Sequence, residues 1–150
     1  MPIIKKISLA KDRKYNNQKI IAIDYGTRKF GLALSDQSLT IATPYANYQR
    51  RELKTDLEFI SNEVLNNNIN AIVIGLPKEL NNEQQAIAQQ VKSFANILSQ
   101  NFPQDIFYWD ERFSSRAAER LMQHKEFKGQ NNDKYSACFI LQAFLDFRKN

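Results

Sequence analysis

Residues 71–76, Ala-Ile-Val-Ile-Gly-Leu, form a continuous apolar run that Pro77 closes. The run is far shorter than the roughly 20 apolar residues that a helix needs to cross a membrane. A strand that is apolar at every position leaves no face for water, so both of its faces must be covered. This segment therefore predicts a strand inside a sheet that has other elements packed on both sides.

The segments on either side of this run have the spacing of amphipathic helices. Apolar side chains recur every three or four positions between residues 51 and 68, and an Asn-rich stretch at 66–70 ends the pattern. The same spacing predicts a helix over residues 83–100, followed by a short strand over 106–109. Alternation of strands and helices is typical of parallel sheets.

The first part of the chain predicts consecutive strands instead. Residues 19–25 and 29–34 read as two adjacent strands, and the turn between them contains Gly26, for which we expect a positive φ. A third strand is predicted over residues 39–46, where Pro44 favours a place at a sheet edge or at a strand end.

Two more helices complete the predicted order. Ser114 or Ser115 can cap the first of them. Residues 133–148 form the last helix, after a polar loop over residues 124–132. The order predicts an α/β fold with a mixed sheet, in which three antiparallel strands come first and parallel strands follow, flanked by helices.

The net charge of +5 is concentrated at the N-terminus. Residues 1–19 contain six of the 21 Lys and Arg residues but one of the 16 Asp and Glu residues, so the rest of the chain is neutral overall. We predict that residues 1–18 are a flexible basic extension that could touch phosphates. Residues 19–150 are then a single domain, as expected for 150 residues.

Composition excludes several other classes of protein. No apolar run is long enough for a membrane helix, and the basic N-terminus lacks the apolar core of a secretory signal. The single cysteine, Cys138, cannot form an internal disulfide and lies in an apolar helical pattern, as a buried thiol in a reducing compartment would. We therefore expect a cytoplasmic protein.

Three acidic residues stand at predicted element ends: Asp24 closes the first strand, Glu111 follows the strand at 106–109, and Asp133 begins the last helix. Ligand sites in open α/β sheets form beyond the carboxyl ends of strands, so these carboxylates can converge. Divalent cations accept such oxygen ligands and relieve the repulsion between them. Caps and turn formers are an alternative role for each of these residues.

Four stretches of the chain resemble the YqgF/RuvX family, which has a ribonuclease H-like fold. They are residues 24–36 (Asp-Tyr-Gly-Thr-Arg-Lys-Phe-Gly-Leu-Ala-Leu-Ser-Asp), residues 75–77 (Gly-Leu-Pro), residues 110–115 (Asp-Glu-Arg-Phe-Ser-Ser), and the spaced set of Asp133, Ala137 and residues 140–142. Together they span nearly all of the chain beyond the basic extension.

The resemblance implies a nuclease that cleaves phosphodiester bonds in structured nucleic acid with Mg²⁺ or Mn²⁺. Asp24, Glu111 and Asp133 would be its catalytic and metal-binding residues, with two ions gripping the scissile phosphate once substrate is bound. The favoured role is processing of the 5′ end of pre-16S rRNA, with ribosomal precursor particles as possible partners. Resolution of four-way DNA junctions is the alternative. We expect a monomer or a weak homodimer, because only the two-fold junction favours a dimer.

Arg28, Lys29 and Arg112 flank these acids and are candidate nucleic-acid contacts, because a cation there can meet phosphate oxygens. The alternative for each is a solvated charge or an ion pair with Asp36 or Asp110.

The chain departs from the family pattern at two places. The loop at 78–83 has no Gly, and the basic residues Lys125 and Lys128 are diluted by Glu126. The only histidine, His124, is expected to be solvated at a helix end.

Two further interpretations are open. Residues 24–27 also resemble the phosphate loop of sugar kinases and actin-like ATPases, but those proteins enclose ATP between two such domains and this chain supplies one. A non-catalytic nucleic-acid or ribosome-binding module with the same fold is the other interpretation. The presence of all three acids favours the nuclease over that module.

Overall fold

A six-stranded mixed sheet forms the centre of the computed structural model, which describes residues 4–77, 79–111, 113–123 and 133–149. Its strands, in the order β1-β6-β5-β2-β3-β4, are β1 (Ile4–Lys5), β6 (Asp105–Asp110), β5 (Ile69–Leu76), β2 (Lys19–Tyr25), β3 (Lys29–Ser35) and β4 (Ala42–Gln49). β2, β3 and β4 are antiparallel neighbours, whereas β1, β6, β5 and β2 are parallel. The predicted mixed α/β sheet is confirmed.

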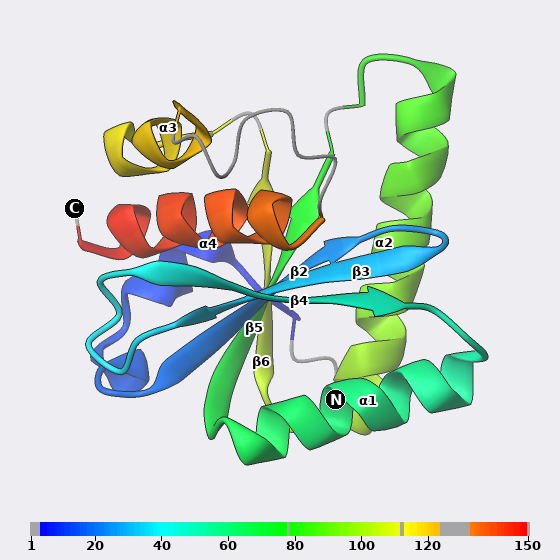
Figure 1. The fold of residues 1–150 in the computed structure, drawn as a ribbon, viewed down its shortest axis with the longest axis horizontal. Helices are drawn as coiled ribbons and strands as arrows, with labels where there is room; N and C mark the ends of the chain where they lie inside the picture. The colour runs from blue at the N-terminus through cyan, green and yellow to red at the C-terminus, as the bar shows by residue number, and fades with distance from the viewer. Residues whose placement is uncertain (1–3, 78, 112, 124–132, 150) are drawn as a thin grey trace.

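Helices cover both faces of the sheet (Figure 1). α1 (Leu53–Asn66) and α2 (Asn82–Asn101) pack on one face, and α4 (Asp133–Lys149) packs on the other, with α3 (Arg116–Gln123) against it. In the part of the chain that the structure describes, none of these helices combines the length and apolar character of a membrane span. Ser115 caps α3, because its Oγ accepts the N–H of Ala118 at 3.0 Å.

Strand alternation divides the buried side chains between two cores. In β2, Ile20 and Ala22 face α4, whereas Ile21 and Ile23 face α1 and α2. β5 lies between β6 and β2 and is buried on both faces, as its continuous apolar run predicts.

Two details around β4 differ from the sequence predictions. β4 begins at Ala42 and not at residue 39, because Leu39 has a positive φ of 59° in a turn that the Asp36 carboxylate closes by accepting the N–H groups of Thr40 and Ile41. Pro44 lies on this strand, which is at the edge of the sheet as predicted.

The prediction of a positive φ for Gly26 is wrong. Its φ lies outside the left-handed region, and a Cβ at this position would stand 2.5 Å from the carbonyl oxygen of Lys29. Gly26 is therefore required for a close backbone approach, not for a left-handed turn.

The prediction of a flexible extension over residues 1–18 is wrong for the described residues 4–18. Ile4 and Lys5 form β1 on the edge of β6, and two short 3₁₀ helices follow, η1 (Ile7–Lys11) and η2 (Arg13–Tyr15). Ala10 and Tyr15 are fully buried in the α4-side core.

Polar contacts hold this segment in place at both of its 3₁₀ helices. The Tyr15 hydroxyl donates to Asp105 at 2.6 Å, and burial together with that carboxylate raises the pKa of Tyr15 well above its usual value. The Arg148 guanidinium, at the end of α4, donates to the Ala10 carbonyl at 2.6 Å. The sequence pattern did not predict this docking, because Asp105 and Arg148 lie about ninety or more residues away from the groups that they bind.

We expect Tyr15→Ala to lower the free energy of unfolding by about 3–5 kcal/mol, as for other buried aromatic residues cut back to Ala. Tyr15→Phe keeps the ring and removes one hydrogen bond, so it should cost only about 1 kcal/mol. Urea unfolding of both variants measures these differences. Equal and small losses in the two variants would mean that the N-terminal segment is not docked in solution.

Candidate active site

Asp24 and Glu111 reach the same face of the sheet from the carboxyl ends of parallel strands. Asp24 continues the alternation of Ile20 and Ala22 toward α4, so its side chain lies on the α4 face. Glu111 follows β6, and its N–H donates to the carbonyl of Leu76 at 3.1 Å, which extends the β5–β6 pairing by one residue.

Gly75 provides the space between these two acids. It lies on β5, between β2 and β6, and a Cβ there would stand 3.0 Å from Glu111 Oε1 and 2.5 Å from Ile140 Cδ1. Any larger residue would therefore push against the carboxylate of Glu111. The Gly of the Gly-Leu-Pro motif keeps the middle of the site open.

A close contact between α4 and β3 places Asp133 at the site. Gly31 is the residue of β3 that pairs with Asp24, and a Cβ on Gly31 would stand only 1.9 Å from the carbonyl oxygen of Asp133. The first turn of α4 therefore rests on the backbone of β3, beside Asp24. Asn47 of β4 supports this turn, because its Oδ1 accepts the N–H of Lys134 at 2.8 Å.

Electrostatics couple the three acids. Burial, together with the negative charges of Glu111 and Asp133, raises the pKa of Asp24 to about 8. At neutral pH the carboxyl group of Asp24 therefore ionises less readily than that of an ordinary aspartate.

The carboxylates do not form a closed cage. Within the residues described, no group of three or more His, Cys, Asp or Glu side chains is arranged to hold a metal ion. Any ion here would need further ligands from water or substrate.

One of the predicted phosphate contacts lies beside the acids. Lys29 Nζ stands 3.9 Å from Asp133 Oδ2, so its ion-pair partner is a site acid and neither Asp36 nor Asp110. Arg28 precedes it in the β2–β3 turn with an exposed side chain. Arg112 lies outside the described residues, as do Lys78, His124 and the predicted loop at 124–132.

Sequence reasoning missed the residue that fixes this turn, Arg50. Its guanidinium donates to the Gly26 carbonyl at 3.1 Å and to the Tyr25 hydroxyl at 3.0 Å, and its Nε pairs with the fully buried Asp56 at 3.0 Å. Asp56 lies one helical turn before the buried Ile60, and an acid at a core-facing position demands a partner. The four-residue spacing of Asp56 and Ile60 was therefore the sequence signal that could have indicated a buried acid with a basic partner.

The prediction of a buried thiol at Cys138 holds in the structure. Cys138 is buried, and burial raises the pKa of its thiol to about 12. Trp109 packs in the core against Phe144 and Phe147.

A mixed sheet of this order, covered by helices on both faces, has the ribonuclease H-like fold. The fold is similar to that of T. thermophilus RuvC in complex with a Holliday junction substrate, with a TM-score of 0.58 and 11% identity over 88% of this chain and 96% of that one. The chain belongs to the RuvX family, described as Holliday junction resolvase, whose model matches residues 18–147.

Curated relatives cover most of the chain. A protein of Koribacter versatilis is 36% identical over 87% of this chain and 88% of its own length. One of Paramagnetospirillum magneticum is 34% identical over 99% of this chain and 97% of its own length. Both are named "Putative pre-16S rRNA nuclease". The protein is accordingly a hydrolytic nuclease that acts on nucleic acid.

The raised pKa of Asp24 predicts a pH-dependent stability in the absence of divalent cations. The folded state holds the Asp24 proton up to about pH 8, whereas the unfolded chain releases it near pH 4, so the free energy of unfolding should fall as pH rises between these values. Asp24→Asn should remove this fall and raise the Tm at pH 8, by about 2–4 °C for each kcal/mol gained. Thermal unfolding in chelator at a series of pH values measures the effect. A wild-type protein with the same pH profile as the variant would contradict it.

The two site glycines should respond differently to Ala. Gly31→Ala forces two backbones apart and should destabilise the fold by at least about 1–3 kcal/mol. Gly75→Ala meets only side-chain ends, so the protein should fold while cleavage activity drops through the displaced Glu111. Thermal unfolding and a nuclease assay on both variants separate the two effects. Full activity in Gly75→Ala would show that Glu111 does not need this space.

Proposed function

We propose that this protein is a divalent-metal-dependent nuclease that processes the 5′ end of pre-16S rRNA, with Asp24, Glu111 and Asp133 as its catalytic and metal-binding carboxylates. The observation that carries the proposal is the placement of these acids on one face of the sheet, where two of them raise the pKa of the third. A carboxyl group held in this way is stabilised in its charged form by a cation.

The donor set fits Mg²⁺ or Mn²⁺. All three groups offer hard oxygen ligands, and Mg²⁺ commonly uses one or two carboxylates together with water and substrate phosphates. An open arrangement without a three-ligand cage suits that mode of binding, and we propose two ions in the substrate complex. When bound, such ions activate the attacking water and stabilise the leaving oxygen.

The protein residues around the acids would position the substrate. Lys29 holds Asp133 at one side of the site and can offer its ammonium to a phosphate oxygen. Arg28 and Arg112 are proposed as further phosphate contacts. Arg50 keeps the turn that carries Arg28 in a fixed place, because it binds the Gly26 carbonyl and donates its own N–H to the Arg28 carbonyl at 2.8 Å.

The names of the curated relatives favour pre-16S rRNA over a four-way DNA junction. We further propose that the protein acts in the cytoplasm, on ribosomal precursor particles, as a monomer or a weak homodimer. In support, the large apolar side chains that the described residues expose are spread over different elements, as with Ile41, Leu65 and Leu80.

Asp24→Asn tests the site. We expect it to reduce cleavage by more than the roughly 10–100-fold that is lost when a residue behind a metal ligand is changed. Glu58→Gln, which removes an exposed carboxylate from α1, is the matched control and should keep wild-type activity. Cleavage that survives in Asp24→Asn, or in excess chelator, would refute the proposed site.

The same assay separates the two substrates. A fragment that contains the pre-16S 5′ end and a synthetic four-way junction are incubated side by side with Mg²⁺, and Asp24→Asn serves as the blank. We expect cleavage of the RNA. Symmetric nicking of the junction with the RNA intact would instead assign the protein as a junction resolvase.

A further inference from the structure

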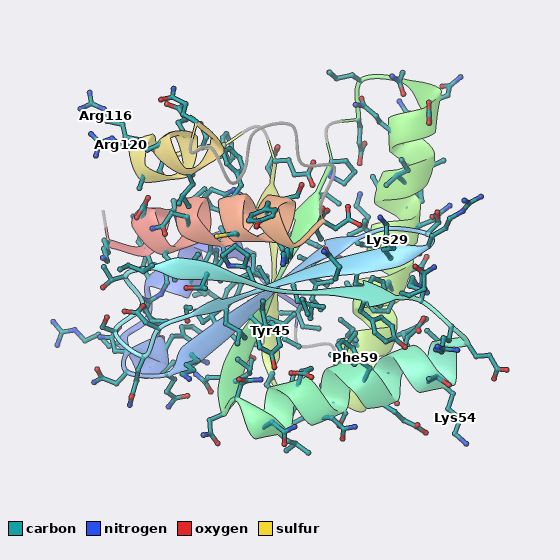
Figure 2. The ribbon with its side chains drawn as sticks, in the orientation of Figure 1. Lys29, Tyr45, Lys54, Phe59, Arg116 and Arg120 are labelled. Atoms are coloured by element: carbon teal, nitrogen blue, oxygen red, sulfur yellow. The ribbon has the colours of Figure 1, made fainter. Side chains whose placement is uncertain are left out.

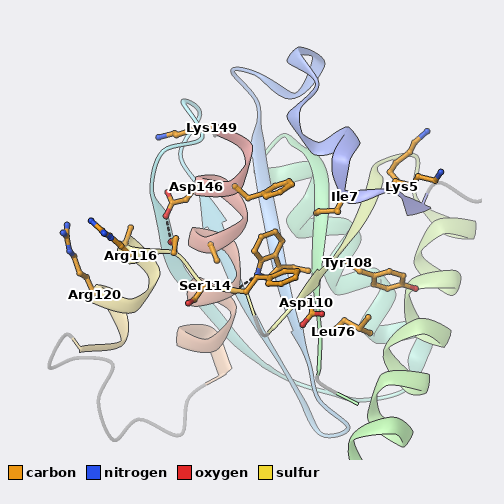
Figure 3. Close-up of a pocket in the computed structure, with 17 residues that line it drawn as sticks. Lys5, Ile7, Leu76, Tyr108, Asp110, Ser114, Arg116, Arg120, Asp146 and Lys149 are labelled. Carbon is orange, nitrogen blue, oxygen red and sulfur yellow. Dashed lines mark hydrogen bonds between the residues drawn. The ribbon is translucent and has the colours of Figure 1, made fainter. Parts of the chain in front are cut away.

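A pocket of about 1090 Å³ opens at the edge of β6 (Figure 3). Its inner surface is apolar and aromatic, and includes Trp109, Phe113 and Phe147. Two of its lining residues, Asp110 and Phe113, flank Glu111 in the sequence. We call this cavity the β6-edge pocket.

The pocket exists because β1 is short. β1 pairs only with Ile106 and Phe107, so in the described part of the chain residues 108–110 of β6 have no strand on that side. Tyr108, Asp110 and the first residue of η1, Ile7, line the space that is left.

Phe113 presents its ring to solvent from a fixed backbone. The side chain is 57% exposed, although Phe is normally buried. Its N–H donates to the Asp110 carbonyl at 3.0 Å, and its carbonyl accepts the indole N–H of Trp109 at 3.1 Å. The Trp109 ring also supports the Phe113 ring edge-on, at a centroid distance of 6.0 Å. The face of Phe113 is therefore held in place and available to a flat ligand.

Cations surround this aromatic surface. Figure 3 shows Lys5 on one side of the pocket and Arg116 and Arg120 of α3 on the other. The basic lining residues are Lys5, Lys6, Arg116, Arg120 and Lys149, and none of them forms an ion pair with another described residue. The acidic lining residues are two, Asp110 and Asp146. The Asp146 carboxylate is already used by Ser115 and Gln142.

We propose that the β6-edge pocket binds unpaired nucleotides next to the scissile phosphate, with one base stacked on Phe113 and the flanking phosphates near Lys5 and the α3 arginines. Bases in a duplex are stacked on each other, so only an unpaired base can offer its face to an aromatic side chain. The open β6 edge could also accept an extended peptide, but the cations on both sides of the pocket favour a polyanion. The inference rests on the proposed nuclease function and assigns it a single-stranded part of the substrate.

The first test is binding of a short fluorescently labelled single-stranded RNA, measured by anisotropy in chelator so that no cleavage occurs. Phe113→Ala should weaken binding by about five- to hundredfold, the range for removal of one base–aromatic stack. Phe113→Trp keeps an aromatic ring at this position and should bind the RNA as the wild-type protein does. Leu65→Ala removes a 69% exposed apolar side chain on α1 and should leave binding unchanged.

The second test uses charge. The Arg116→Ala/Arg120→Ala double variant should flatten the slope of log affinity against log salt by about 0.7 for each phosphate that the arginines no longer neutralise. Lys54→Ala, an exposed lysine on α1 (Figure 2), is the control and should not change the slope. Duplex RNA of the same sequence should show no dependence on Phe113.

Three outcomes would overturn the proposal. They are equal RNA affinity in Phe113→Ala and Leu65→Ala, an unchanged salt slope in the arginine double variant, and binding of an acidic extended peptide with no binding of RNA. None of these measurements requires cleavage. Failure of the pocket is therefore seen in affinity, whereas failure of the proposed function is seen as activity in Asp24→Asn.

Discussion

The close approach of α4 to β3 is the contact on which the arrangement of the site depends. Gly31 has no side chain, so the first turn of α4 lies directly on the sheet, and Asp133 comes to rest beside Asp24. Asn47 supports that turn from β4. Without this contact Asp24 and Glu111 would still stand at strand ends, but Asp133 would lie on a helix away from them. The contribution of Asp133 to the raised pKa of Asp24 would then weaken.

Local pattern predicted much of the fold and the candidate acids. The continuous run at 71–76 indicated a central strand because its composition leaves no polar face, and the positions of Asp24 and Glu111 followed from the ends of predicted strands. That the Asp133 backbone would touch β3 could not be predicted, because a glycine in a strand does not indicate which element packs on it.

Long-range polar contacts account for what the sequence patterns missed. The basic composition of residues 1–18 favoured a solvated extension, yet one buried ring at Tyr15 and its hydrogen bond to Asp105 hold the described part of it in the fold. Similarly, no sequence pattern indicated a role for Arg50, which joins the β2–β3 turn to Asp56. Such partners are chosen by tertiary structure, and composition gives no information about them.

The tie between Arg148 and the Ala10 carbonyl has a consequence for the order of events during synthesis. Residues 4–15 leave the ribosome before their partners on β6 and at the end of α4, which follow them in the chain. At about 5–20 residues per second, the N-terminal segment must wait on the order of ten seconds before its last partner exists. Its many charged residues keep it in solution during that interval, until Arg148 of α4 binds the Ala10 carbonyl.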